Sequence, residues 1–65
     1  MPKYPDITIQ LSGVDGNAFA ILGAVIRAAR QGGLPEAEIQ QFRTEATAGD
    51  YHQLLATCMA WFNVE

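Results

Sequence analysis

The sequence predicts an α+β domain in which one N-terminal strand is followed by three helices, with all of residues 1–65 in a single domain. Three observations support this prediction. Residues 6–11 alternate apolar and polar side chains, and residues 17–30 are almost entirely apolar up to Arg27. Two further amphipathic stretches follow, and each begins at a helix-start signal.

The strand is predicted at residues 6–11, DITIQL, where β-branched residues are frequent and every second residue is apolar. Its apolar residues share one face: Ile7, Ile9 and Leu11. Pro2 and Pro5 precede it, and because proline has no backbone donor we expect both outside the centre of any sheet.

A single strand needs a neighbour for its backbone donors and acceptors. The sequence leaves two partners open. Residues 6–11 can pair with the same strand of a second copy, which removes an exposed edge. Alternatively, residues 62–65 form a short C-terminal strand beside them, and otherwise that end frays.

The first helix is predicted at residues 17–30, between the turn SGVDG and the helix-ending QGG. Asn17 or Asp15 supplies the N-cap, and Arg27 and Arg30 lie near the negative end of the helix dipole. The polar residues fall within a sector of about 100° and the apolar ones spread over most of the rest. We therefore expect this helix to need cover on more than one side, which favours a partner chain.

The second helix is predicted to begin at Pro35, with a narrow apolar stripe, and to end at Gly49. The stripe consists of Ile39, Phe42 and Ala46. The third helix is predicted from Tyr51 to Phe62. Its apolar residues are Tyr51, Leu54, Leu55, Cys58, Met59, Trp61 and Phe62, and its polar side is His52, Gln53 and Thr57.

The composition restricts the kinds of partner. A net charge of −3, without a basic stripe, argues against nucleic acid. The longest apolar run has nine residues, about half of a membrane span, and no export signal is recognisable, so neither a membrane nor secretion is expected. The lone thiol of Cys58 favours the cytoplasm and rules out an intramolecular disulfide. Because so short a chain is marginally stable, we expect it to form a homodimer.

No catalytic, cofactor-binding or metal-binding residue is predicted. His52 and Cys58 are six residues apart, which places them about 240° from each other around a helix. The loop that begins at Asp15 lacks the glycine and glutamate that a calcium loop needs. Arg27 and Arg30 are three residues apart and either bind an acidic group or form a solvated face, of which the solvated face is favoured.

Two sets of residues are candidates for an interface. The first set serves two competing ways of dimerising: the strand pairs with its symmetry mate, or two central helices pack closely through a row of alanines. The second is the apolar end of the last helix, since tryptophan and methionine are frequent where proteins meet. The candidate interface residues are Ile7, Ile9, Ala20, Ala24, Ala28, Met59, Trp61 and Phe62.

Two segments carry a resemblance to a known group: YPDITIQLSGVDGNAFAILGAV at residues 4–25 and GDYHQLLATCMAWFNV at residues 49–64. They resemble small bacterial proteins that are frequent in phage and plasmid genomes and for which no activity is established. The resemblance implies a bacterial or mobile-element source and no particular reaction. Members of that group often have an acid directly after GDY, where this chain has His52.

These observations favour a small acidic, non-enzymatic interaction protein, with an accessory or regulatory role, that acts as a homodimer. One alternative is an acidic inhibitor that mimics nucleic acid and binds a basic protein. A second alternative is a small enzyme or ligand-binding subunit, which would need a pocket where His52, Asp50 or Asp15 converge.

Overall fold

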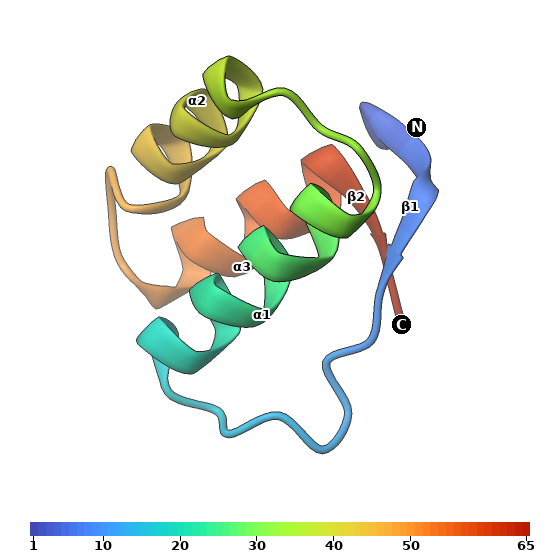
Figure 1. The fold of residues 1–65 in the computed structure, drawn as a ribbon. Helices are drawn as coiled ribbons and strands as arrows, with labels where there is room; N and C mark the ends of the chain where they lie inside the picture. Colours follow the sequence, from blue (N-terminus) through green and yellow to red (C-terminus); the bar gives the residue numbers. More distant parts are fainter.

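The computed structural model describes all of residues 1–65 and confirms the predicted α+β fold (Figure 1). Three helices lie together, and two strands run side by side along one edge of them. None of the helices combines the length and the apolarity that are needed to cross a bilayer. The elements in chain order are β1 (Tyr4–Ile9), α1 (Ala18–Gln31), α2 (Glu36–Ala46), α3 (Tyr51–Trp61) and β2 (Phe62–Val64).

Strand β1 pairs with β2 of the same chain, so the second of the two predicted partners is confirmed. The strands are parallel because the three helices return the chain to the end of the sheet where it started. Thr8 lies opposite Asn63, and Ile9 lies opposite Val64. The pairing continues beyond β2, because the Glu65 N–H donates to the carbonyl of Ile9 at 2.8 Å.

The predicted boundaries of the first strand are wrong by two residues at each end, since β1 covers residues 4–9 rather than 6–11. Pro5 therefore lies within the strand and not before it. The sheet tolerates this proline because its register is irregular between Tyr4 and Thr8, so no regular ladder bond requires a donor there.

Helix α1 begins and ends as its sequence predicts. The Asn17 side chain accepts a hydrogen bond from the Ala20 N–H at 3.1 Å and so caps the first turn. At the other end, Gly33 has a φ of 87°, and the Leu34 N–H donates to the Ala29 carbonyl at 3.0 Å. This is the Schellman arrangement, in which a left-handed glycine reverses the chain.

The core lies between the helices and the two strands. The predicted stripe of α2 is confirmed, because Ile39, Phe42 and Ala46 are all buried. Phe42 packs edge-on against two rings from the end of the chain, with centroid distances of 5.6 Å to Trp61 and 5.3 Å to Phe62. Such edge-to-face pairs contribute roughly 0.5–1.5 kcal/mol beyond the area they bury.

Helix α3 turns Leu54, Cys58 and Trp61 to the core as predicted, and it differs from the prediction in its last residue and at three positions around that face. It ends at Trp61, and Phe62 adopts an extended backbone with φ −132° and ψ 164° because it begins β2. Thr57, assigned to the polar side, is buried, and its hydroxyl donates to the Gln53 carbonyl at 2.8 Å. Tyr51 and Met59, assigned to the apolar side, are exposed.

Candidate functional site

Three of the predicted interface residues belong to the core of the single chain. Ile9, Trp61 and Phe62 are each no more than 3% exposed, so they contribute little to the surface of the monomer. Met59 is 59% exposed and Ile7 is half-buried. Of the strand and the last helix, Met59 therefore offers the largest free apolar side chain.

The alanine row of α1 is partly covered within the monomer, and Gly32 beyond its end lies against the chain's own first strand. Ala20, Ala24 and Ala28 are half-buried, and Gly32 continues the row four residues later. A Cβ atom at Gly32 would lie only 2.8 Å from Cδ1 of Ile7 in β1. The missing side chain of Gly32 thus allows the strand to approach the end of the helix, and the flank with the alanines is partly covered within the monomer.

Phe19, on the opposite flank of α1, is the most exposed large apolar side chain inside a helix or strand, at 86%. It lies in the first turn of α1, beside the residues that face α2 and α3. Its exposure was not predicted, since an apolar residue in an apolar helix gives no sign that it is left uncovered. The α1 sequence nevertheless predicted that one helix face would lack cover.

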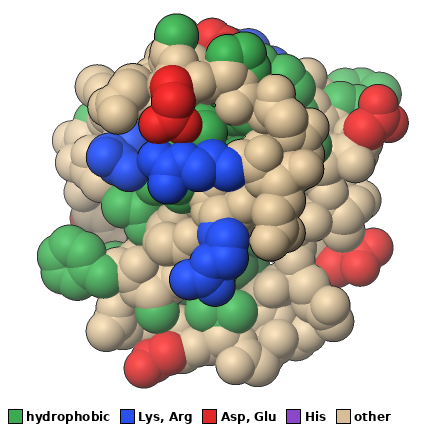
Figure 2. All heavy atoms as spheres, viewed as in Figure 1, with side chains coloured by type: hydrophobic (Ala, Val, Ile, Leu, Met, Phe, Trp, Pro, Cys, Tyr) green, Lys and Arg blue, Asp and Glu red, His purple; other side chains and the backbone are tan.

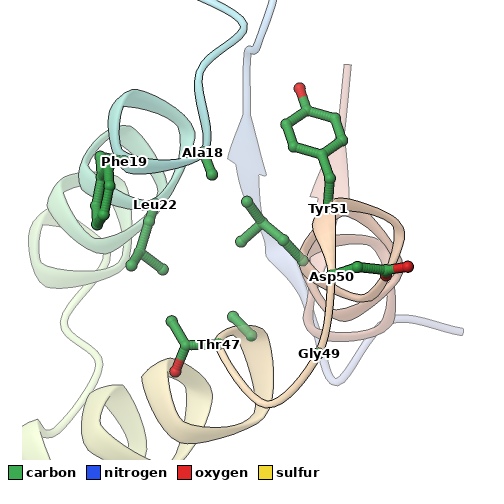
Figure 3. Close-up of a pocket in the computed structure, with 9 residues that line it drawn as sticks. Ala18, Phe19, Leu22, Thr47, Gly49, Asp50 and Tyr51 are labelled. Carbon is green, nitrogen blue, oxygen red and sulfur yellow. The ribbon is translucent and has the colours of Figure 1, made fainter.

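An apolar groove lies beside Phe19, between the first turns of α1 and α3 and the last turn of α2 (Figure 3). Its volume is about 260 Å³. Ala18 and Leu22 point into the space between α1 and α3, and the Tyr51 ring stands on the opposite wall. The apolar residues that line the groove are Ala18, Phe19, Leu22, Ala46, Tyr51 and Leu54.

Two polar contacts hold the walls of this groove in place. The Tyr51 hydroxyl donates to the Gly16 carbonyl at 2.7 Å and so joins the start of α3 to the start of α1. The Asp50 carboxylate points away from the groove and accepts from the Gln53 N–H at 3.0 Å as the N-cap of α3. The groove therefore presents an apolar surface whose polar neighbours are already paired.

A basic hollow lies further along the seam between α1 and α2, where Figure 2 shows Lys and Arg side chains gathered on one face. It has a volume of about 370 Å³. Arg27 and Arg30 reach it from α1 and Arg43 from α2, while Gly23, Ile26 and Gln31 complete its lining. The two helices run in opposite directions, which brings residues that are distant in sequence to the same hollow.

Only one of these three arginines has a carboxylate within 4 Å. Arg30 donates through two nitrogens to the Glu36 carboxylate, each at 3.1 Å, and this bond lowers the pKa of Glu36. Arg27 and Arg43 have no such partner. The predicted proximity of Arg27 and Arg30 is thus confirmed, and Arg43 joins them.

A third polar cluster connects β1 with α2. Glu38 accepts a hydrogen bond from the Tyr4 hydroxyl at 2.5 Å and lies 2.9 Å from the Lys3 ammonium. Both contacts lower the pKa of Glu38. The same ammonium lies 4.1 Å from the centre of the Trp61 ring, and the indole N–H donates to Glu45 at 3.0 Å. Every group here has a partner, so the cluster reads as a structural clamp.

The structure brings no other titratable groups together as a site. His52 is exposed, whereas Cys58 is buried and burial raises the pKa of its thiol to about 11, so the thiolate is scarce at neutral pH. No three His, Cys, Asp or Glu side chains converge in a geometry that could hold a metal ion.

Comparison of the chain with protein-family models, with curated proteins and with solved structures finds no match. Any functional assignment must therefore come from the surfaces themselves. The two that stand out are the apolar groove beside Phe19 and the basic hollow.

Proposed function

We propose that this protein is a non-enzymatic interaction protein that acts as a homodimer, in which Phe19 of each copy occupies the apolar groove of the other. The observation that carries the proposal is the position of Phe19: its ring is 86% exposed and stands at the rim of a groove that it helps to line. A projecting group next to its own socket is self-complementary under a two-fold axis, which is the symmetry of most homodimers.

Size and energy support the same arrangement. A groove of about 260 Å³ has room for a phenyl ring, and it is lined mainly by apolar side chains such as Leu22 and Leu54. Full burial of a phenylalanine side chain contributes roughly 1.5–3 kcal/mol, and a two-fold axis doubles this contribution. A 65-residue chain has a small core, so an additional apolar contact adds a large share of its stability.

The setting we propose for this dimer is the bacterial cytoplasm, where it serves as an accessory or regulatory protein. A single buried thiol, Cys58, suits a reducing compartment. The resemblance of residues 4–25 and 49–64 to small phage and plasmid proteins supports a bacterial or mobile-element source.

The proposal is tested by sedimentation equilibrium of the wild type, Phe19→Ala and Met59→Ala from about 1 µM to 1 mM. Met59→Ala is the matched control, because it removes the next most exposed large apolar side chain of a helix, on α3. The wild type and Met59→Ala are expected to show twice the 7.1 kDa monomer mass, and Phe19→Ala to dissociate at least about a hundredfold more readily.

Two results would reject the proposed interface. One is a wild type that stays at 7.1 kDa over the whole range. The other is a dimer that Met59→Ala weakens and Phe19→Ala leaves intact, which would move the interface to α3. Circular dichroism at the lowest concentration is the folding control, and Phe19→Ala is expected to keep the helical signal of the wild type, since the Phe19 ring lies outside the monomer core.

A further inference from the structure

Three of the four cationic side chains of this acidic protein line one hollow on the α1–α2 seam. We infer that this hollow, lined by Arg27, Arg30 and Arg43, binds an anion of the phosphoryl class. The inference concerns a different surface from the groove beside Phe19 and holds whether or not the protein dimerises.

The positive charge of the hollow is only partly paired with carboxylates. The chain carries seven acids, yet only Glu36 contacts any of the three guanidinium groups. Arg27 and Arg43 come from different helices, and neither has a carboxylate within 4 Å. An anion in the hollow is attracted by both guanidinium groups, so the site has an electrostatic reason to be occupied.

A glycine in the wall of the hollow, Gly23, is a second and independent feature of this surface. It lies in the middle of α1, where glycine destabilises a helix by roughly 0.5–1 kcal/mol relative to alanine. Neither crowding nor a positive φ requires it, because a Cβ atom there would have no neighbour within 4 Å. Packing within the monomer therefore does not explain this glycine, whereas its missing side chain leaves the wall of the hollow open to a ligand.

The donors favour a phosphoryl group over a single carboxylate. One carboxylate is satisfied by one guanidinium fork, as Glu36 already is by Arg30. Arg27 and Arg43 add two unpaired forks, and Gln31 lies beside them. A phosphoryl group carries up to two negative charges and three strong acceptor oxygens, which suits several guanidinium groups at once. The hollow of about 370 Å³ has room for more than one such group.

The inference is tested by titrating ¹⁵N-labelled protein with pyrophosphate at low salt and following the amide and arginine Nε signals. Saturable shifts are expected at Gly23, Arg27 and Arg43. Phosphoserine, titrated in parallel, reports whether the site prefers a phosphate monoester to a free diphosphate, and binding of either supports the inference. Arg27→Gln and Arg43→Gln are each expected to weaken binding about tenfold or more.

Two matched variants separate a local site from general electrostatics. Lys3→Gln removes the same charge outside the hollow and is expected to leave the affinity within about twofold of the wild type. Gly23→Leu fills the wall of the hollow with a better helix former, so it is expected to raise the thermal midpoint and abolish binding.

Three results would overturn the inference. The first is that neither pyrophosphate nor phosphoserine at about 10 mM and low salt shifts the signals of the hollow, since binding weaker than this does not define a site. Equal weakening by Arg27→Gln and Lys3→Gln would show that only net charge matters. Unchanged binding in a folded Gly23→Leu variant would place the anion elsewhere.

Discussion

At the scale of single residues, two glycines of the α1 region have opposite effects on stability. Gly33 has a φ of 87°, which only glycine adopts without strain, and it ends the helix. Gly23 has an ordinary helical backbone and open space around it. It is therefore less favourable in the helix than alanine would be, and no packing contact compensates for this.

We therefore expect substitutions by alanine at these two positions to differ in sign. Gly33→Ala should lower the free energy of unfolding by about 1–2 kcal/mol, the cost of a left-handed backbone for an L-residue. Gly23→Ala should raise it by roughly 0.5–1 kcal/mol. Urea denaturation of the two variants beside the wild type measures both, and a destabilised Gly23→Ala would show that glycine has a structural role within the monomer.

At the scale of elements, the clamp formed by Lys3, Tyr4 and Glu38 fixes β1 to α2. Strand β1 has only one three-residue neighbour in the sheet, so its ladder alone holds it weakly. The side-chain contacts to α2 add an attachment across 34 residues of sequence. This attachment depends on the ionised form of Glu38.

The clamp predicts a loss of stability in acid. Its two donors lower the pKa of Glu38 in the folded protein, whereas the unfolded chain has the ordinary value of about 4.3. The stabilisation is therefore complete above about pH 5 and is lost as the pH falls through the folded pKa. Glu38→Gln should flatten the dependence of the free energy of unfolding on pH below 5, as measured by denaturation at several pH values.

The matched control is Glu36→Gln, which removes the other carboxylate whose pKa is lowered. Its partner Arg30 is 53% exposed and Glu36 itself 64%, so solvent screens the pair and a smaller effect is expected. If Glu36→Gln changed the acid dependence more than Glu38→Gln, the clamp would not be the main acid-sensitive contact.

The order of the elements could be predicted because caps and periodicity are local. Asn17, Pro35 and Asp50 mark the three helix starts to within a residue. The period of α3 also placed Leu54, Cys58 and Trp61 in the core, but it did not fix the edges of that face, because apolar or small residues lie on both sides of it. Burial of Thr57 and exposure of Met59 follow from packing against α2 and β2, which the period of α3 does not encode.

The candidate sites could be predicted only where their residues lie on the same helix. Arg27 and Arg30 are on one helix, so their spacing places them together. Arg43 belongs to another helix, and only the antiparallel packing of α1 and α2 brings it to the hollow. The groove beside Phe19 is likewise formed by three helices, so no single segment of sequence could indicate it.

At the scale of the whole molecule, the chain builds a core from both of its ends and leaves one flank of α1 without cover. The residues in the core include Ile9 near the start and Phe62 near the end of the chain. Phe19 remains outside this core, at the rim of the groove. The homodimer we propose supplies the cover that α1 lacks within one copy.

The most direct measurement is an isotope-filtered NOE experiment on a mixture of labelled and unlabelled protein, which detects only contacts between copies. If Phe19 of each copy occupies the groove of the other, NOEs are expected from the Phe19 ring protons of one copy to the methyl groups of Leu22 and Leu54 of the other. Intermolecular NOEs confined to other residues, such as Met59 or Ile7, would contradict this arrangement. Their complete absence at millimolar concentration would contradict the dimer itself.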